Sequence, residues 1–423
     1  VPVGTDKKGE PVSRNIGQLL PGNQHLIAFG STAISGGKMP FLGAIELDTG
    51  KLANWNDAPF KRNYNVASYN VIWRGDAAWF AGAFTNLWRY EPASGEVVRV
   101  LSMSWNQRCT RFAATPKWFL FGQAAYFGPD FSGEQVSVGR SGCALPNTPA
   151  NGMTYFTPTA CRCTTLVRGF HAMTGGVAPD PIPDTERLVA RAEDPLIQSF
   201  STTLPAGPVA QDWVKQQRSG IRETEPVSFG DLSLVAIVQQ HRMEARRDGT
   251  SVWSVVAGAR ISSPPIIMDH LAIFGSHDGW VYAVDAKGQI RWKYLLAPSE
   301  RLIAINGQLE NAWPVYGVTL LDGMIIASAG THVELSGGVT VAALDPSTGK
   351  PKWIKRLQKH PSLIPAGGKG AKVTAYSFTN TVPRVVDGRI VLGNEGRRNS
   401  VFSFAPNESE TSLNARLNQP PKK

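Results

Sequence analysis

Short runs of alternating apolar and polar residues, separated by Asp/Gly turns, recur along this chain. In the clearest unit, residues 343–353, a strand, a tight turn at Gly349 and a second strand ending in Trp follow one another. A copy one residue shorter ends at Trp292, and a copy one residue longer ends at Trp55. Because repeat units bury their apolar faces against one another, this repetition predicts a repeat architecture.

The pattern of this unit predicts the outer hairpin of a β-sheet. Residues 273–275 and 280–284 are rich in β-branched and aromatic residues and are expected to be strands. His277-Asp278-Gly279 between them is expected to be a hairpin turn, since Asp-Gly readily takes the positive φ that such turns need. Four antiparallel strands form one blade of an all-β propeller, which is the predicted fold class. The Trp that closes a unit is expected to pack between blades and dock on the adjacent turn. The expected docking residues are Trp55, Trp253, Trp292 and Trp353.

Degenerate copies extend the repeat over the rest of the chain. The eight expected blades lie at 20–58, 64–102, 103–140, 147–176, 225–258, 261–297, 311–357 and 379–408. Seven blades are the alternative if 103–176 forms one irregular blade with loops. The array is expected to form a single domain over 1–423. It would carry an irregular inter-blade insertion at about 177–224, with a short helix at 185–193, and a flexible tail from about 409.

The charge and hydropathy of the chain limit the classes of partner that it is expected to bind. No run approaches the 18 apolar residues of a membrane span, so no transmembrane segment is expected. The net charge of +10 suits an anionic polysaccharide, a lipid surface or nucleic acid, but the basic residues are scattered, which favours a role in solubility. The densest cluster, Arg242 with Arg246 and Arg247, falls in an expected turn. No nucleic-acid-binding signature accompanies it, so no nucleic-acid partner is expected.

Four cysteines cluster in the least regular blades: Cys109, Cys143, Cys161 and Cys163. An even number in Gly/Pro-rich loops favours at least one disulfide and an oxidising compartment. Cys109–Cys143 and Cys161–Cys163 are the favoured pairs among three possible connectivities, with free thiols as an alternative. Gaps of 34 and 18 residues are unlike a zinc ribbon, so no metal site is expected.

No catalytic residue is expected. The seven histidines are dispersed, and neither an H-E-x-x-H nor a G-x-S-x-G motif occurs. His270 and His277 are expected to lie solvated in turns. The Gly-rich run 366–371 lacks the spacing of a phosphate-binding loop and is expected to be a flexible loop.

Residues 274–285, the run 301–315 and the unit ending at Trp353 resemble the bacterial pyrroloquinoline-quinone-binding-like repeat proteins, which have the quinoprotein alcohol dehydrogenase-like propeller fold. The resemblance is strongest over 258–357. It implies a propeller in the periplasm or outside the cell. Quinoprotein dehydrogenases of this fold hold their cofactor with adjacent cysteines, a Trp and calcium ligands. This chain has no adjacent cysteine pair and no assignable calcium set, so pyrroloquinoline quinone with calcium is disfavoured and no cofactor is expected.

The favoured function is a non-catalytic extracytoplasmic scaffold that holds protein partners in a larger complex. The alternatives are a polysaccharide-binding or polysaccharide-cleaving propeller and a quinoprotein-type oxidoreductase. If the chain has a ligand site, it is expected in the long connection between two well-defined blades, where propellers expose loops. The candidate residues there are Arg301, Gln308, Glu310 and Trp313. An ion pair between Glu310 and Arg301 is the alternative role for those two residues.

Overall fold

The structure is a computed structural model, and its contacts divide the chain into two compact units. Unit 1 comprises 1–176 with 361–373, and unit 2 comprises 177–360 with 374–423. The single propeller domain over 1–423 therefore stays a prediction. The residues that the structure describes are 2–5, 11–34, 37–56, 70–81, 87–101, 111–122, 125–135, 141–142, 145–157, 170–175, 180–190, 222–305, 308–360, 362–364, 377–393 and 401–419.

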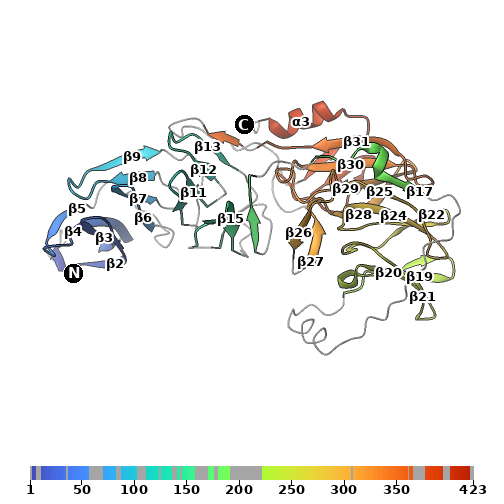
Figure 1. Cartoon of the computed structure of the whole chain (residues 1–423), viewed down its shortest axis with the longest axis horizontal. Coiled ribbons are helices and arrows are strands. Elements are labelled where there is room, and N and C mark those ends of the chain that lie inside the picture. The colour runs from blue at the N-terminus through green and yellow to red at the C-terminus, as the bar shows by residue number, and fades with distance from the viewer. Residues whose placement is uncertain are drawn as a thin grey trace. The chain divides into compact units, whose positions relative to one another are not determined.

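Unit 1 consists of antiparallel sheets (Figure 1). The first sheet contains β1 (Pro2–Thr5), β2 (Pro11–Pro21), β3 (His25–Ile34), β4 (Gly37–Glu46) and β5 (Leu52–Asn56). The second contains β6 (Asn70–Arg74), β7 (Ala77–Ala81), β8 (Leu87–Tyr90) and β9 (Val97–Leu101). The third contains β10 (Ala113–Ala114), β11 (Phe119–Phe121), β12 (Ala125–Phe127), β13 (Gly133–Gln135) and the distant strand β32 (Ser362–Ile364). The fourth contains β14 (Thr148–Ala150), β15 (Met153–Phe156) and β16 (His171–Met173).

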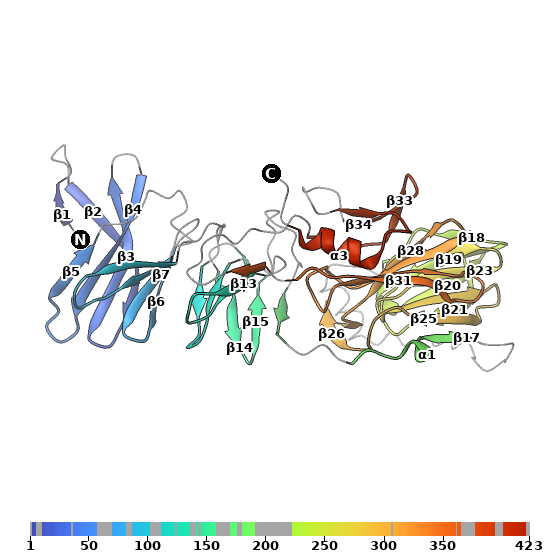
Figure 2. The ribbon, with the colours of Figure 1, turned by 90° about the horizontal axis from the view of Figure 1, so that it is seen from above.

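Unit 2 repeats the same plan (Figure 2). Its first sheet contains β18 (Val227–Phe229), β19 (Leu232–Ile237), β20 (Arg242–Arg247) and β21 (Thr250–Val256), with a 3₁₀ turn η2 (Val238–Gln240). The next contains β22 (Ile266–Met268), β23 (Leu271–Gly275), β24 (Trp280–Asp285), β25 (Ile290–Leu295) and β17 (Leu188–Ala190). Then come the hairpin β26 (Leu302–Ile305) with β27 (Gln308–Asn311), and the sheet of β28 (Val315–Leu321), β29 (Met324–Ala329), β30 (Val339–Leu344) and β31 (Pro351–Leu357). The last sheet contains β33 (Arg384–Val386), β34 (Arg389–Leu392) and β35 (Phe402–Phe404). The described part of the unit also contains the helices α1 (Asp184–Arg187) and α3 (Glu410–Asn418).

The all-β expectation with antiparallel sheets is confirmed, and the four-stranded sheet is the basic element. Three sheets each consist of four strands that follow one another along the chain. They are the sheets β6–β9, β18–β21 and β28–β31. The five-stranded sheets of β10–β13 and β22–β25 each gain a strand from elsewhere in the sequence, β32 and β17. In the described residues no helix has the length and hydropathy needed to cross a membrane.

Tryptophans join neighbouring sheets of unit 2. The indole Nε1 of Trp253 in β21 donates to Ala286 O (2.9 Å) in the β24–β25 turn of the next sheet, and its ring covers Gly288. In the same way, Trp292 in β25 donates to Pro346 O (2.8 Å) and covers Gly349 in the β30–β31 turn. A Cβ on Gly349 would lie 2.6 Å from the indole, so this turn needs glycine.

The other two expected docking tryptophans have different surroundings. Trp55 stacks on Phe41 within its own sheet, with ring centroids 4.4 Å apart. The contacts from β5 to the next turn come instead from Asn54, which donates to Pro92 O, and from Asn56, which donates to Gly95 O (3.2 Å). The extra residue of this copy explains the shift, because it moves Trp55 by one position along the strand. Trp353 is partly buried beside the last sheet, with Lys355 Nζ 4.5 Å from its ring centroid.

The first part of the expected insertion packs on unit 2. A short helix, α1, begins one residue before the expected position but ends at Arg187. Strand β17 begins at the next residue, Leu188, and pairs with β25. The buried guanidinium of Arg187 donates to the carbonyls of Leu295 (3.1 Å), Ala297 (2.7 Å) and Pro298 (3.3 Å). Residues 188–190 are therefore part of the β22–β25 sheet, and Arg187 is bonded to the end of the same sheet. Residues 191–221 lie outside the described residues.

In place of the flexible tail expected from about 409, the chain forms helix α3 (Figure 2). This helix covers the edge of β31. Leu413 and Leu417 are fully buried in the core of the last two sheets. Three side chains spaced by four residues accept hydrogen bonds from backbone N–H groups of β31 and of the residues that directly follow it. Glu410 pairs with Arg356 (2.7 Å), Asn414 with Gln358 (2.8 Å) and Asn418 with His360 (2.9 Å). Open strand edges need such cover, and the short helix supplies it through polar side chains, which an apolar periodicity does not reveal.

Replacing Asn414 with Ala is expected to speed hydrogen exchange of the Gln358 amide and to lower the free energy of unfolding by about 1–3 kcal/mol. The Asn414 amide also donates to Arg356 O (2.8 Å), so the change removes two bonds at one edge. Mass spectrometry after deuterium exchange measures the local effect. Asn407→Ala, at an exposed position before the helix, is the control. Equal exchange at 356–360 in both variants would contradict the role given to α3.

Candidate functional site

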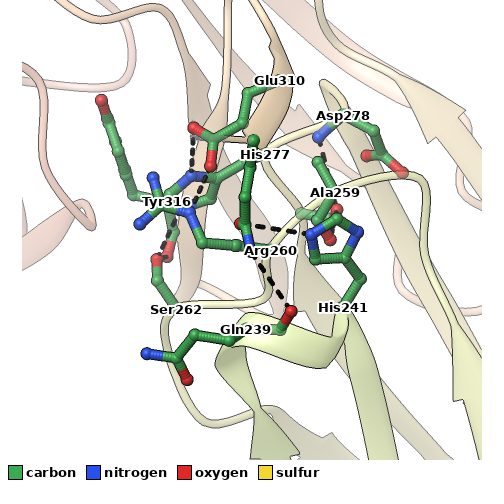
Figure 3. A network of polar contacts seen from close by, with 11 residues as sticks. Gln239, His241, Ala259, Arg260, Ser262, His277, Asp278, Glu310 and Tyr316 are labelled. Atoms are coloured by element: carbon green, nitrogen blue, oxygen red, sulfur yellow. Dashed lines mark hydrogen bonds and ion pairs between the residues drawn. The ribbon is translucent and has the colours of Figure 1, made fainter. Parts of the chain in front are cut away.

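A buried polar network lies where four connecting segments of unit 2 meet (Figure 3). The segments are the connection from β21 to β22, the β23–β24 turn, the hairpin β26–β27 and the start of β28. We call it the Glu310 network. Its members are Arg260, Ser262, His277, Glu310 and Tyr316.

Glu310 is the centre of this network, and only 1% of it is exposed. Arg260 Nε donates to one carboxylate oxygen, and His277 Nδ1 lies 2.9 Å from the other. Burial opposes ionisation of this carboxyl, but the hydrogen bonds from His277 and Arg260 outweigh it and hold the pKa of Glu310 below its usual range. The carboxylate is therefore charged and has partners on both oxygens.

His277 lies between Glu310 and Ser262. Its Nε2 is 2.7 Å from Ser262 Oγ, and the edge of the ring meets Tyr316 with centroids 5.0 Å apart. Only 3% of His277 is exposed, so the expectation of a solvated turn was wrong for this residue. His270 is exposed, as expected. Burial raises the pKa of Tyr316 to about 12, and the nearby Glu310 charge acts in the same direction.

Ser262, His277 and Glu310 stand in the order of a Ser–His–acid relay. Such a relay also needs N–H donors beside the serine and access for a substrate. Here the serine hydroxyl faces the Tyr316 carbonyl at 3.3 Å, and the imidazole is closed in by the tyrosine ring. The arrangement joins the β22–β25 sheet to the hairpin, and we interpret it as a structural network.

A second anchor holds the same hairpin. Gln308 Oε1 lies 3.3 Å from His241 Nε2, and Gln308 Nε2 donates to Gln239 O (3.3 Å). These partners lie in η2 and directly after it, in the turn that joins β19 to β20 of the β18–β21 sheet. The hairpin is thus attached by Gln308 to one sheet and by Glu310 to the next.

The structure brings together two of the four candidate residues, Gln308 and Glu310. Trp313 lies in the core with 2% exposure, and its Nε1 donates to Ser336 O (2.8 Å). Arg301 is exposed at the base of the hairpin. The alternative pairing of Glu310 with Arg301 was wrong, because Arg260 occupies that place.

The face of the hairpin opposite to these anchors is apolar and exposed. Leu302 is 59% exposed and Leu309 61% exposed. Leu309 pairs with Ala304 across the hairpin, and alternation along a strand places Leu302 on the same face. Neighbouring Gln308 and Glu310 point to the other face, into the protein. A rigid base therefore presents an apolar surface to solvent.

The basic cluster of the sequence analysis is not a free patch in a turn. Arg242, Arg246 and Arg247 lie in strand β20. Arg242 and Arg246 pair with Glu244 (2.9 and 2.7 Å), and Arg247 pairs with Asp231 (2.8 Å). Their charges are balanced by acidic neighbours, so this cluster does not attract a polyanion by itself.

The described residues contain no group of three or more His, Cys, Asp or Glu side chains placed to hold a metal ion. Cys109, Cys143, Cys161 and Cys163 lie outside the described residues, as does the Gly-rich run 366–371. The disulfide therefore stays a prediction.

Sequence reasoning missed a second buried cluster, near β33. Lys359 is 2% exposed and lies 2.5 Å from Glu334, which also accepts a bond from Ser377 (2.9 Å). The backbone N–H of Glu334 donates to His332 Nδ1 (3.1 Å), so the proton of this imidazole is on Nε2, 3.3 Å from Ser377 Oγ. Burial, helped by the Lys359 charge, lowers the pKa of His332 to about 3. No spacing motif marks these residues, because the fold alone brings them together.

Because His332 stays neutral in the folded chain, the free energy of unfolding of the protein should fall as the pH is lowered. Between the usual pKa of 6.5 and the folded value of about 3, only the unfolded state binds this proton. The resulting loss is about 1.4 kcal/mol per pH unit below pH 6.5. Urea unfolding of wild type and His332→Gln at pH 7.5, 6.5 and 5.5 measures it. The slope should be smaller in the variant, and His270→Gln, an exposed site, should keep the wild-type slope.

The comparisons with known proteins agree with the repeat pattern. Residues 210–363 and 278–406 match a family model described as "Outer membrane protein assembly factor BamB". This match confirms the resemblance to repeat proteins of the pyrroloquinoline-quinone-like propeller class. No curated protein matches the chain.

Solved structures align over long stretches but at low similarity. BamB from Moraxella catarrhalis aligns at 12% identity over 95% of this chain and 97% of that chain, with a TM-score of 0.24. The computationally designed Ika8 protein aligns at 9% identity over 93% and 96%, with a TM-score of 0.27. The designed Ika4 protein aligns at 12% identity over 43% and 88%, with a TM-score of 0.26. Scores of this size carry no conclusion about the fold, and the all-β assignment of this chain rests on its own strand pairings.

Proposed function

We propose that this chain, a protein with pyrroloquinoline-quinone-like propeller repeats over residues 210–406, is a scaffold that docks protein partners within a larger assembly. The single observation that carries the proposal is the hairpin β26–β27. Its inner face is tied to two sheets by Gln308 and Glu310, and its outer face presents Leu302 and Leu309 to solvent. A rigid apolar surface of this kind is typical of a protein-binding site.

The proposal extends to architecture and location. The sheets with three or more strands would serve as the blades of an eight-bladed propeller, with seven blades as the alternative. The matched family model describes an outer membrane assembly factor, which supports a place in the periplasm or outside the cell. Disulfides among the four cysteines would fit that compartment.

The proposed scaffold uses no cofactor and carries out no reaction. The partly buried Ser262 and the buried His277 support the hairpin, and Trp253, Trp292 and Trp313 are held in the protein by hydrogen bonds of their indoles. These tryptophans therefore give no support to a polysaccharide site. Incubation with pyrroloquinoline quinone and calcium should give no dye reduction in the presence of alcohols.

The double variant Leu302→Ser, Leu309→Ser is expected to weaken partner binding at least tenfold while the chain stays folded. Both side chains are exposed, so the change removes apolar contact area of the complex and little of the core. A complex isolated from the native host by a tag on this chain identifies the partner. Affinity for the purified partner then gives the measurement.

Val386→Ser in β33 is the matched control, because Val386 is 50% exposed in the same unit and belongs to a sheet to which neither Gln308 nor Glu310 is bonded. Its affinity should equal that of wild type. If both variants bind the partner as wild type does, the hairpin is not the docking surface.

The insertion offers a separate test. Deleting 191–221 should leave unit 2 folded, because β17 and Arg187 keep their contacts with the β22–β25 sheet. Deleting all of 177–224 would remove that strand and destabilise the unit. Loss of assembly on deletion of 191–221, with normal folding, would assign this segment to the interface as well.

A further inference from the structure

Unit 1 contains a cleft of about 920 Å³ beside the strands β6 and β10. This volume is within the range of small-ligand pockets. The residues that line the cleft all belong to unit 1, and nothing in the proposed docking function uses them. Residues that line it include Gln18, Trp73, Arg74, Trp79, Arg111 and Pro146.

Aromatic side chains form much of its wall. Trp73 packs over Gly22, where a Cβ would lie 2.5 Å from the indole. Trp79 is fixed by a hydrogen bond from its Nε1 to Arg74 O (3.1 Å) and by contact with Phe119, at 4.8 Å between ring centroids. Since these rings are held in place, the cleft offers a preformed apolar surface.

A cation lies in this apolar wall. The guanidinium of Arg74 donates to Pro116 O (2.7 Å) and lies over the ring of Phe119, 4.2 Å from its centroid. Burial lowers the pKa of Arg74. Arg74 forms no ion pair with a carboxylate of the described residues, and Asp76, which also lines the cleft, pairs with Arg89 (3.3 Å). A partly desolvated guanidinium of this kind favours an anion.

Backbone groups add a second polar feature. Gln18 Nε2 donates to Val71 O (2.8 Å), and Val71 N donates to Gln18 Oε1 (3.2 Å), so this side chain satisfies the outer edge of β6 at Val71. Strand alternation places the backbone groups of Trp73 on the same edge, facing the cleft. An amide or carboxylate bound there would have both a charged partner and a strand edge.

We propose that this cleft binds a carboxylate carried on an apolar group, with the carboxylate on Arg74 and the apolar part against Trp73 and Trp79. Two sources share this chemistry, a free organic acid and the C-terminus of an apolar peptide. A guanidinium–carboxylate contact and aromatic packing act together in both cases.

The test uses the full chain and two pairs of probes in calorimetric titrations. The first pair is 3-phenylpropionate and its amide, and the second is an acetylated apolar tripeptide with a free C-terminus and the same tripeptide amidated. The expected result is that at least one acid binds and its amide binds ten- to a hundredfold more weakly. The substitution Arg74→Gln should weaken binding of the acid by the same factor. Arg99→Gln, an exposed arginine of the same unit, should not.

Binding of phenylpropionate alone would assign a free acid, and binding of the peptide acid alone would assign a chain terminus. Salt dependence keeps the proposal testable if Arg74→Gln fails to fold. Raising the salt concentration should then weaken binding of the acid to the wild-type chain and leave binding of the amide unchanged. If neither acid binds, if acid and amide bind alike, or if a folded Arg74→Gln binds as wild type, the proposal is wrong.

Discussion

Replacing Glu310 with Ala is expected to lower the free energy of unfolding of unit 2 by about 3–5 kcal/mol, the usual result of removing one partner from a buried charged network. The change leaves Arg260 without its carboxylate and removes the partner of His277 Nδ1 in a site where both residues are largely buried. The hairpin would lose its tie to the β22–β25 sheet. Urea unfolding followed by hydrogen exchange at the hairpin measures both effects.

The pH dependence of this difference has a definite sign. Since the pKa of Glu310 is lowered in the folded chain, its stabilising effect is present above the usual carboxyl pKa and is lost as the pH falls below it. Wild type and Glu310→Ala should therefore converge in stability below about pH 4. Glu300→Ala, at an exposed carboxylate nearby, is the matched control and should stay within about 0.5 kcal/mol of wild type. A loss below 1 kcal/mol for Glu310→Ala at pH 7 would contradict the importance of the network.

Replacing Trp292 with Ala is expected to destabilise unit 2 by about 3–5 kcal/mol as well. Only 1% of this side chain is exposed, and it fills the space between β25 and the β30–β31 turn. The smaller residue leaves a cavity and an unpaired Pro346 carbonyl. Thermal and urea unfolding at neutral pH measure the loss.

Two further variants separate packing from the hydrogen bond. The variant Trp292→Phe keeps most of the buried area. Its loss of unfolding free energy should be less than half of that of Trp292→Ala. Trp118→Ala, at a tryptophan that is 47% exposed, should change stability by about 1 kcal/mol or less. If Trp292→Ala and Trp118→Ala were equally mild, Trp292 would not join the two sheets.

The repeat pattern predicted the sheets well because it records local rules. Alternating strands and Asp/Gly turns are fixed by neighbouring residues, so β23 and β24 lie where the sequence predicted them. The position of Trp292 at the end of its unit also follows from the spacing, and its glycine partner recurs at Gly349 in the next copy. Even the change at Trp55 follows from one extra residue in the repeat.

The site was less predictable because its contacts cross between repeats. The sequence placed His277 in a turn, which is correct, but no local pattern indicates that Glu310, 33 residues later, covers that turn. The same limit applies to Arg260, 50 residues before Glu310. Strands β17 and β32 also join sheets far from their own place in the chain. Such pairings depend on the whole fold.

The cover of β31 by α3 has a consequence for synthesis of the chain. Glu410 follows Arg356 by 54 residues, so β31 leaves the ribosome before its helix exists. At 5–20 residues per second, the interval is about 3–11 s, during which the N–H groups of this edge are open to pairing with another nascent chain. Cotranslational chaperones would be needed most in that interval, and slow codons between β31 and α3 should raise the yield of aggregated protein.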